Sequence, residues 1–280
     1  MKKYLSFLVF VTTLIVHIGC KENEEITNPE NIVPTDSVIV PFSPIDTKII
    51  LKLFEEINPA NRNVVLFCYT EQTYSPSGSK IISTISQISD TFKIDFQELY
   101  ISTFGAAIFT PATVNFDLNA LQNGSYVLDI KINTKKIWGM ITVTDGLFSL
   151  EIQPNNIIYL YQEELHRIPR TIIWGQAESI QPTPFQIFLD SLVISGAQAH
   201  NLQVGDYHYF EIDSQGGFSI NSALGMAYGK HFLYNFEGDT LITRNLVKRF
   251  AKRYLDSIYI QLFGGRGEMY FSTVLKNEPW

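Results

Sequence analysis

The chain has 280 residues, with 28 acidic and 21 basic side chains, and its formal net charge at pH 7 is −7. An acidic surface repels polyanions, so we do not expect nucleic acid as a partner. Hydrophobic residues make up 45% and aromatic residues 13% of the sequence, which excludes an intrinsically disordered chain and supplies enough apolar surface for a sizeable core.

The first element along the chain is an N-terminal apolar segment. Lys2 and Lys3 precede a mostly apolar run over residues 4–18. A membrane-spanning helix needs about 20 apolar residues, so this run is short for a stable span. A basic start, a short apolar run and a small residue before the cleavage position are typical of a secretory signal peptide. We therefore expect residues 1–19 to be removed from the mature protein.

Gly19 and Cys20 close this apolar run, and its end resembles the lipobox of bacterial lipoproteins. The resemblance implies that Cys20 is the lipidation site, that it is diacylated on its sulfur with acyl chains such as palmitate, that the peptide is cut before it, and that its new amine is acylated. Two or more acyl chains anchor a protein stably, whereas a single chain binds only marginally. The alternative is a plain signal peptide followed by a chance cysteine.

The residues after the cysteine resemble the acidic export signal of Bacteroidota surface lipoproteins. They are Lys21, Glu22, Glu24 and Glu25. The resemblance implies an outer-membrane, lipid-anchored and cell-surface-exposed protein; the alternative is an ordinary solvated tether. Residues 20–45 contain several prolines and show no helical periodicity, so we expect a lipidated tether that stays extended. Within it, Asp36-Ser37-Val38 resembles the O-glycosylation site of Bacteroidota proteins and implies Ser37 as the modified residue.

Residues 46–156 are expected to form a β-sandwich domain, because short runs of alternating hydrophobicity lie between turn residues. The expected strands are Lys48–Phe54, Val64–Thr70, Lys80–Ile88, Phe92–Tyr100, Thr113–Leu118, Ser125–Asn133, Lys136–Thr144 and Leu147–Gln153. Asp145-Gly146 is the strongest hairpin signal, because a type I′ turn needs positive φ at both central positions. The stretch FDLNALQNGSYVLDIKI resembles the closing strands of immunoglobulin-like and fibronectin-like modules of bacterial surface proteins, which implies an immunoglobulin-like sandwich.

Residues 157–280 are expected to form an α+β domain with two helices and antiparallel strands. Thr183 as the cap, Pro184 in the first turn and Gly196 as the stop predict the first helix. The second helix is predicted from Arg244 to about Ser257, because apolar residues recur there on one helical face. These residues are Val247, Phe250, Ala251, Tyr254 and Leu255. The pairs YFEID–SQGG–FSIN and IYIQLF–GGRG–EMYFSTV are typical of hairpins.

The common catalytic motifs are absent from the sequence, including the G-x-S-x-G elbow, the phosphate-binding loop and H-E-x-x-H. Cys68 lies on the Val64 and Leu66 face of an alternating run, so we expect a buried, inert thiol rather than a nucleophile. We expect no cofactor and no metal. A metal site would be the alternative if three or four ligands converged. The residues that could supply them are His200, Asp206, His208 and His231.

Two groups of residues in the second domain are candidates for binding. On a strand, Tyr207 and Tyr209 would share one exposed face, and flat aromatic rings stack on sugars. With their neighbours they form the candidate ligand site: Tyr207, Tyr209, His208 and His231. The second helix carries a candidate basic patch for lipid phosphates or an acidic partner: Lys248, Arg249, Lys252 and Arg253. The alternatives are core aromatic residues and a solvated helix face.

The function favoured by these observations is a lipid-anchored, non-catalytic binding or assembly component of the cell envelope, whose partner is a glycan or another envelope protein. The alternative is an envelope hydrolase whose acid and base groups meet only in the fold. Its candidate residues are Glu163, His166, Asp206, His208, Glu211 and Asp213. A structural adhesion subunit is a third class. We expect the ligand site in the second domain, because the histidines, the basic patch and the tyrosine pair all lie there.

Overall fold

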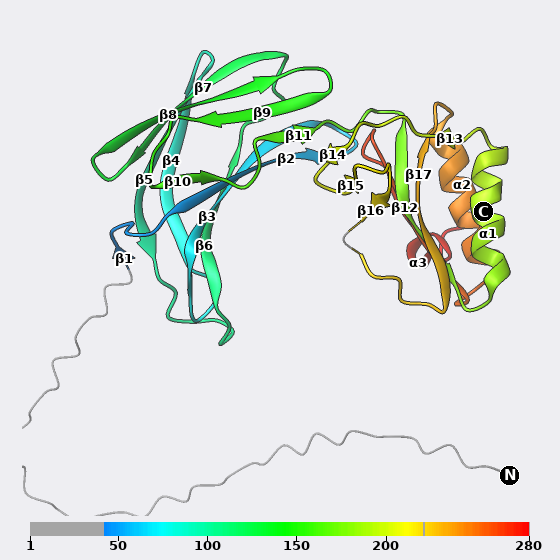
Figure 1. Cartoon of the computed structure of the whole chain (residues 1–280). Coiled ribbons are helices and arrows are strands. Elements are labelled where there is room, and N and C mark those ends of the chain that lie inside the picture. Colours follow the sequence, from blue (N-terminus) through cyan, green and yellow to red (C-terminus); the bar gives the residue numbers. More distant parts are fainter. Residues whose placement is uncertain (1–41, 221, 280) are drawn as a thin grey trace, which may run out of the picture. The chain divides into compact units, whose positions relative to one another are not determined.

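The structure is a computed structural model that describes residues 42–220 and 222–279 (Figure 1). The described part of the chain belongs to one compact unit. Among the described residues, no helix has the length and the apolar character of a membrane span. The expected signal peptide, Cys20, the export-signal residues, Ser37 and most of the tether lie outside the described residues.

The first sheet contains a strand at each of the eight positions that the alternating pattern predicts. Its strands are β1 Phe42–Ser43, β2 Ile49–Ile57, β3 Arg62–Tyr74, β4 Lys80–Ile88, β5 Thr91–Tyr100, β6 Thr110–Asp117, β7 Gly124–Ile132, β8 Lys135–Val143, β9 Leu147–Ile152, β10 Ile158–Leu160 and β11 Glu164–His166. They form one 11-stranded sheet in the order β10-β2-β3-β6-β4-β5-β7-β8-β9-β11, with β1 paired to β5. The last two strands follow residue 156, so the first sheet extends beyond the expected domain boundary.

The pairing makes this sheet mixed and curled. β5 runs parallel to β7 and β10 runs parallel to β2, whereas most other neighbours are antiparallel. Alternate residues of the strands point into one core, which includes Phe92, Phe96 and Phe148. The structure thus confirms a β-rich fold, with 49% of the described residues in strands, but does not confirm the immunoglobulin-like sandwich.

The predicted hairpin at Asp145-Gly146 is present, with Val143 opposite Phe148, but its turn type is different. Neither central residue has positive φ, so the type I′ prediction is wrong. The backbone N–H of Thr144 donates to the carbonyl of Leu147 at 2.9 Å, and the Thr144 hydroxyl also bonds to Leu147. The hydrogen bonds of the Thr144 side chain therefore stabilise this turn, in which Asp145 and Gly146 do not adopt positive φ angles.

The second sheet is antiparallel and has β12 Ile172–Ser179 at its centre. Its order is β13 Gln198–Ala199, β17 Tyr228–Asn235, β12, β18 Ile258–Gly264 and β19 Met269–Phe271. Every residue of β12 is buried, because both faces of the sheet are covered. Ile173 and Ala177 face a core with the helices α1 Pro182–Ile194 and α2 Thr240–Arg253. The short helix α3 Ser272–Leu275 closes this side, where Figure 1 shows α1 and α2 side by side.

The helix ends differ in part from the sequence-based expectation. α1 begins at Pro182 after the N-cap residue Gln181, and no side chain caps it, so the prediction of Thr183 as the cap is wrong. Gly196, with φ of 105°, follows the helix as predicted. α2 begins at Thr240, four residues earlier than predicted, because the Asp239 carboxylate accepts a hydrogen bond from the N–H of Leu241 at 2.8 Å.

The opposite face of β12 packs against a cluster of aromatic and aliphatic side chains that we call the junction cluster. Its buried members are Ile57, Ile168, Ile172, Trp174, Tyr207, Phe210, Ile212 and Leu233. A small three-stranded sheet contributes to it, formed by β14 Gly205–Asp206, β15 Glu211–Ile212 and β16 Phe218–Ser219. Because Ile57 belongs to β2, the junction cluster joins the first sheet to the second.

Candidate anion-binding site

The expected tyrosine surface is not formed. Tyr207 and Tyr209 lie in the turn between β14 and β15, where His208 has a positive φ of 67° that breaks the strand alternation. Tyr207 is buried, with its ring 5.0 Å from His166 and 4.9 Å from Phe210. The Tyr209 hydroxyl accepts a hydrogen bond from the backbone N–H of Ile57 at 3.2 Å. The prediction that the two rings share one exposed strand face is therefore wrong, and both belong to the junction cluster.

The two candidate histidines are tied to different neighbours. The His208 ring stacks on Phe54 at 4.5 Å, and its Nδ1 atom is buried without a hydrogen-bond partner. His231 lies in β17 opposite Gln176 of β12. Among the described residues, no three His, Cys, Asp or Glu side chains converge as metal ligands would. The four residues named as a candidate metal site are therefore not brought together.

Burial of His208 predicts a pH-dependent stability. Desolvation, with Lys52 nearby, lowers the pKa of His208 from 6.5 to about 4, and Asp206 opposes this shift only in part. Between pH 6.5 and pH 4 the unfolded chain then binds a proton that the folded chain does not bind, so the free energy of unfolding should fall as the pH falls through this window. Urea denaturation at a series of pH values measures the slope.

The matched variant is His208→Asn, because asparagine tolerates positive φ and does not titrate. The difference in unfolding free energy between the wild-type protein and this variant should decrease toward pH 4. A difference that stays constant over the whole window would show that His208 does not titrate as its burial requires.

The residues of the hydrolase alternative either have structural partners or are exposed. The Asp206 carboxylate accepts from the N–H of His208 at 2.6 Å, and the Asp213 carboxylate accepts from the N–H groups of Gln215 and Gly217. His166 is stacked on Tyr207, and Glu163 and Glu211 are exposed.

Cys68 is fully buried, and burial raises the pKa of its thiol well above its ordinary value, which agrees with the prediction of an inert cysteine.

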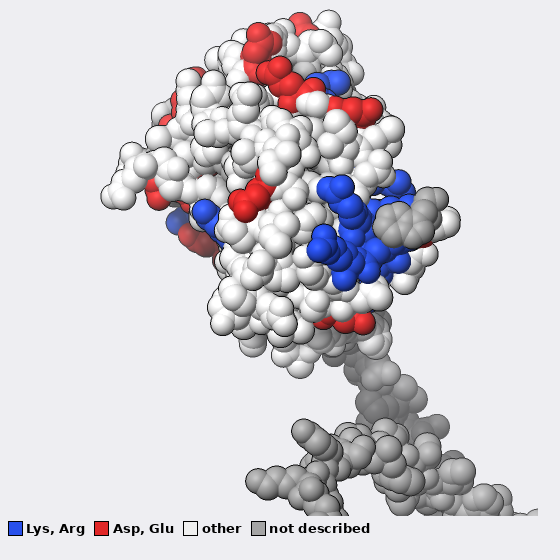
Figure 2. All heavy atoms as spheres, turned by 90° about the vertical axis from the view of Figure 1, so that its right-hand side faces the viewer, with Lys and Arg blue, Asp and Glu red and all other residues white. Residues whose placement is uncertain are grey.

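The candidate basic patch on α2 is smaller than predicted. Lys248 is buried, and its ammonium group donates to the carbonyl of Pro279 and lies 3.6 Å from the Glu278 carboxylate, so its placement on the outer face is wrong. Arg249 and Arg253 are exposed and Lys252 is half-buried. Figure 2 shows Lys and Arg side chains gathered in one cluster on the face formed by the helices.

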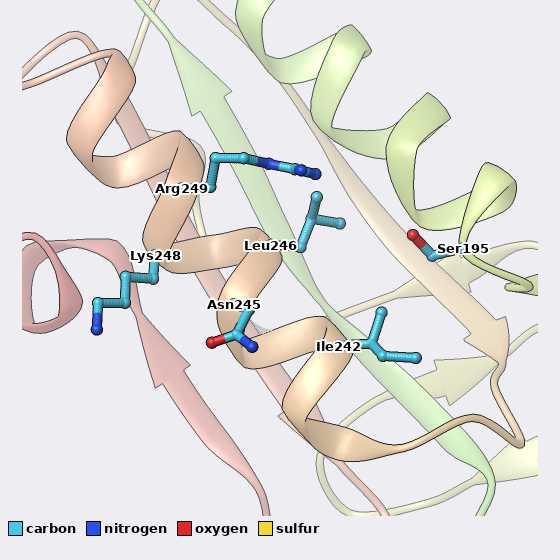
Figure 3. A pocket seen from close by; sticks show the side chains of 6 residues that line it. All are labelled: Ser195, Ile242, Asn245, Leu246, Lys248 and Arg249. Atoms are coloured by element: carbon cyan, nitrogen blue, oxygen red, sulfur yellow. The ribbon is translucent and has the colours of Figure 1, made fainter. Parts of the chain in front are cut away.

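Beside this cluster lies a pocket of about 410 Å³ at the end of α1. Figure 3 shows the Arg249 guanidinium extending over Leu246 toward α1, whereas Lys248 points away. Ser195, Ile242 and Asn245 also line the pocket. The pocket is thus mainly apolar, with one exposed cation at its edge.

The sequence did not predict a larger and more polar pocket beside the junction cluster, which we call the arginine pocket. Its volume is about 630 Å³. It is lined by Ala60, Asn61, Arg62, Ala120, Leu121, Gln122, Asn123, Asp145, Arg167 and Arg170. These residues come from the β2–β3 turn and the first residue of β3, from the β6–β7 and β8–β9 turns, and from the segment after β11, so four separate parts of the chain meet here.

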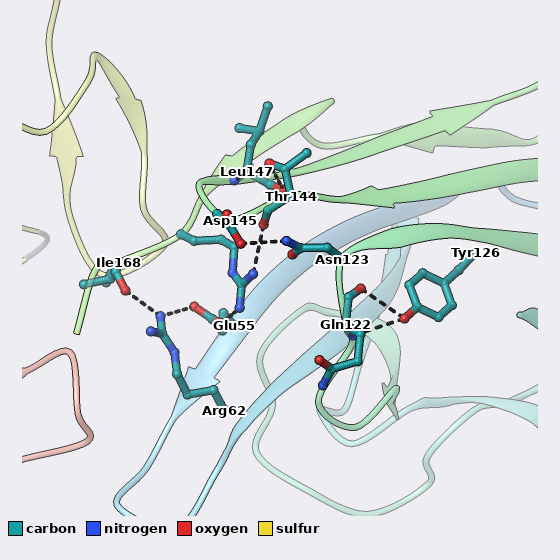
Figure 4. A network of polar contacts seen from close by, with 10 residues as sticks. Glu55, Arg62, Gln122, Asn123, Tyr126, Thr144, Asp145, Leu147 and Ile168 are labelled. Atoms are coloured by element: carbon teal, nitrogen blue, oxygen red, sulfur yellow. Dashed lines mark hydrogen bonds and ion pairs between the residues drawn. The ribbon is translucent and has the colours of Figure 1, made fainter.

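A shared carboxylate holds two of the three arginine residues in place (Figure 4). The Glu55 side chain is only 6% exposed and forms ion pairs with both Arg62 and Arg167. Arg62 also donates to the carbonyl of Ile168 at 2.7 Å, and Arg167 donates to the carbonyl of Thr144 at 2.9 Å. These contacts fix both guanidinium groups before any ligand arrives.

The charges of the pocket do not cancel. One Glu55 carboxylate serves two guanidinium groups, and the exposed Arg170 adds a third. The only other charged lining residue is Asp145, whose carboxylate accepts a hydrogen bond from the Asn123 amide at 2.6 Å. The Nε atom of Arg62 is buried without a hydrogen-bond partner. The pocket is therefore a positively charged region in an acidic protein.

The guanidinium and amide groups that line the arginine pocket indicate which class of ligand it can bind. Guanidinium groups present planar forks of N–H donors that match carboxylate, phosphate and sulfate groups. The amide groups of Asn61, Gln122 and Asn123 can both donate to and accept from hydroxyl groups. Pockets for small ligands usually measure about 300–1,000 Å³, and this volume lies within that range. The arrangement suits a hydroxylated ligand with an acidic group.

One signal in the sequence could have led to this site. Glu55 occupies a core-facing position in the alternating strand IILKLFEEI, and a carboxylate at such a position requires a buried cationic partner. The identity of the partners depends on the fold, because Arg167 is more than a hundred residues away. No protein-family model, no curated protein and no solved structure matches this chain.

Proposed function

We propose that this protein is a lipid-anchored, non-catalytic component of the cell envelope that binds an acidic carbohydrate in the arginine pocket. The observation that carries this proposal is the pair of guanidinium groups held by one buried carboxylate beside a third, exposed arginine. Arginine groups that are already ordered lose little further freedom on binding, which favours affinity for an anionic group.

The anchor and the location belong to the same proposal. Cys20 carries the lipid, Lys21, Glu22, Glu24 and Glu25 direct the chain to the outer face of the outer membrane, and Ser37 is glycosylated in the tether. The lipobox resemblance and the acidic run that follows it support this assignment. At the cell surface the protein would meet extracellular polysaccharides, and those with carboxylate or phosphate groups could pair with the guanidinium groups of the pocket.

The site uses both halves of the chain. Arg62 comes from the half that we proposed as a first domain over residues 46–156, and Arg167 and Arg170 come from the half over residues 157–280. The ligand site therefore lies at the contact between the halves, and we no longer propose it within the second half alone. The first half, whose residues 116–132 resemble immunoglobulin-like modules in sequence only, would have a presenting role.

The test compares two forms of one ligand. We expect the protein to bind an oligosaccharide of uronic acid and not its carboxyl-reduced form, because only the acid can pair with the guanidinium groups. Arg170→Glu should weaken this binding by about 100-fold, since charge reversal removes a charge-assisted hydrogen bond and adds a repulsion. Isothermal titration calorimetry measures both affinities.

The matched control is Arg249→Glu, which makes the same charge change at an exposed position on α2 and should leave the affinity unchanged. Equal binding of the acidic and the reduced oligosaccharide would refute the proposed role of the arginine pocket. So would an equal loss of affinity in the two variants, because a general charge effect would then explain the binding.

A further inference from the structure

The loop between β5 and β6 exposes three large apolar side chains at once. The exposed fractions are 85% for Phe104, 55% for Ile108 and 75% for Phe109. Single exposed apolar residues are common on protein surfaces, whereas a group of them marks an interaction site. We call residues 101–109 the apolar tip.

The apolar tip and the neighbouring loop are free of charge. No Asp, Glu, Lys or Arg occurs between Glu98 and Asp117, or between Glu71 and Lys80 in the β3–β4 turn. The polar side chains of the apolar tip are those of Ser102 and Thr103, which carry hydroxyl groups. Entry into an apolar medium would therefore require no charged side chain to lose its water, which is the largest cost of such a transfer.

The two loops hold each other in a defined conformation. The N–H of Ser77 donates to the carbonyl of Ala106 at 3.0 Å, and the N–H of Ser102 donates to the hydroxyl of Ser79 at 3.1 Å. At Gly105, φ is 145° and a Cβ atom would lie 2.3 Å from the carbonyl oxygen of Ser77, so this close approach requires glycine. These bonds satisfy backbone groups that would otherwise oppose burial in lipid.

The position of the apolar tip relates it to the proposed anchor. The described chain begins with β1, in which Phe42 pairs with Tyr100 at the end of β5, and their ring centroids are 5.6 Å apart. The tip starts at the next residue, Ile101, so β1, the first described strand, lies beside the start of the tip (Figure 1). Cys20 lies 42 − 20 = 22 residues before Phe42, and at about 3.3–3.6 Å per residue this segment spans at most about 75 Å, which allows this end of the sheet to reach the membrane.

We propose that the apolar tip inserts into the lipid surface to which Cys20 anchors the chain. This inference rests on the proposed lipid anchor, but it assigns a second, separate membrane contact. Phe104, Ile108 and Phe109 enter the boundary between headgroups and acyl chains, as the apolar faces of interfacial proteins do. The lipid on Cys20 holds the chain at the membrane only through the tether, and insertion of the tip adds a second apolar contact that fixes the orientation of the sheet on the membrane.

The contact is apolar, so it differs in its requirements from binding through the basic residues of α2. It needs no anionic lipid and persists at high salt, whereas attraction between Arg249 or Arg253 and lipid phosphates would weaken as the ionic strength rises. This difference separates the two surfaces in one experiment.

The experiment uses the Cys20→Ser chain produced without residues 1–19, so that no lipid is attached to the protein. We expect it to float with phosphatidylcholine vesicles in a density gradient, and to do so equally at about 1 M salt, where the Debye length is about 3 Å. Changing Phe104 and Phe109 to serine should lower the vesicle partition coefficient about tenfold for each residue. The thermal unfolding midpoint should not change, since both side chains are exposed.

Ile88→Ser is the matched control, because Ile88 is exposed at the opposite end of β4 and its replacement should not affect flotation.

Absence of flotation, or flotation of the Phe104 and Phe109 variants equal to that of the unchanged protein, would overturn the proposal. Binding that requires phosphatidylglycerol and disappears with salt would assign the contact to α2 instead. Self-association that the Phe104 and Phe109 changes abolish would assign the tip to a second copy of the chain. None of these results depends on the arginine pocket or on lipidation of Cys20, so each failure is distinguishable from failure of the proposed function.

Discussion

Glu55→Gln is expected to lower the free energy of unfolding by about 3–5 kcal/mol, the range observed when one partner of a buried ion pair is removed. The substitution keeps the shape of the side chain and removes only its charge. Arg62 and Arg167 then lose the carboxylate that both of them contact (Figure 4), and their guanidinium groups repel each other in a partly buried site. Urea denaturation followed by circular dichroism measures the change.

Glu71→Gln provides the comparison, because Glu71 forms an exposed ion pair with Lys48 at 3.2 Å. Exposed pairs contribute about 0–1 kcal/mol, so this variant should be close to the wild-type protein. If Glu55→Gln costs no more than Glu71→Gln, Glu55 does not hold the two arginine residues in place. The proposed preorganisation of the arginine pocket would then be lost as well.

The strands of the first sheet were predictable because each of them buries one face and exposes the other. In β2, for example, Leu51 and Leu53 are buried while Lys52 between them is partly exposed. The order of the strands was not predictable in this way. A sandwich and a curled sheet need the same alternation, and the parallel pairing of Phe92 with Leu128 depends on contacts that no local pattern records.

The errors in the candidate sites have a common physical origin, since each of them assumed a regular element. Tyr207 and Tyr209 were expected on one strand face, but the positive φ of His208 turns the chain between them. Lys248 was expected on a solvated helix face, but the chain beyond α3 returns to cover it. Asp239 caps α2 earlier than the apolar periodicity suggested. Local patterns specify elements, whereas the surroundings of a side chain depend on segments that are distant in sequence.

Replacement of Phe188 by alanine should also lower the free energy of unfolding by about 3–5 kcal/mol, the usual cost of truncating a buried phenylalanine. Phe188 is fully buried in the core between α1, α2 and the second sheet. Its ring lies edge-on to Phe232 at 6.0 Å and to Phe250 at 5.4 Å, so the change leaves a cavity and removes two aromatic contacts. Urea denaturation measures the loss, with Val193→Ala on the exposed side of the same helix as the control.

The same variant tests whether the two halves of the chain unfold together. Trp174 lies in the junction cluster, on the face of β12 opposite Phe188, and Trp138 lies in β8 of the first sheet. Ile57 and the hydroxyl of Tyr209 connect the first sheet to that cluster. We therefore expect fluorescence and circular dichroism to report one unfolding transition, whose midpoint in the variant is shifted to a lower urea concentration by the same amount for both signals. Two separated transitions, with only one of them shifted, would show that the halves are independent domains. The arginine pocket would then depend on a contact that opens without unfolding either half.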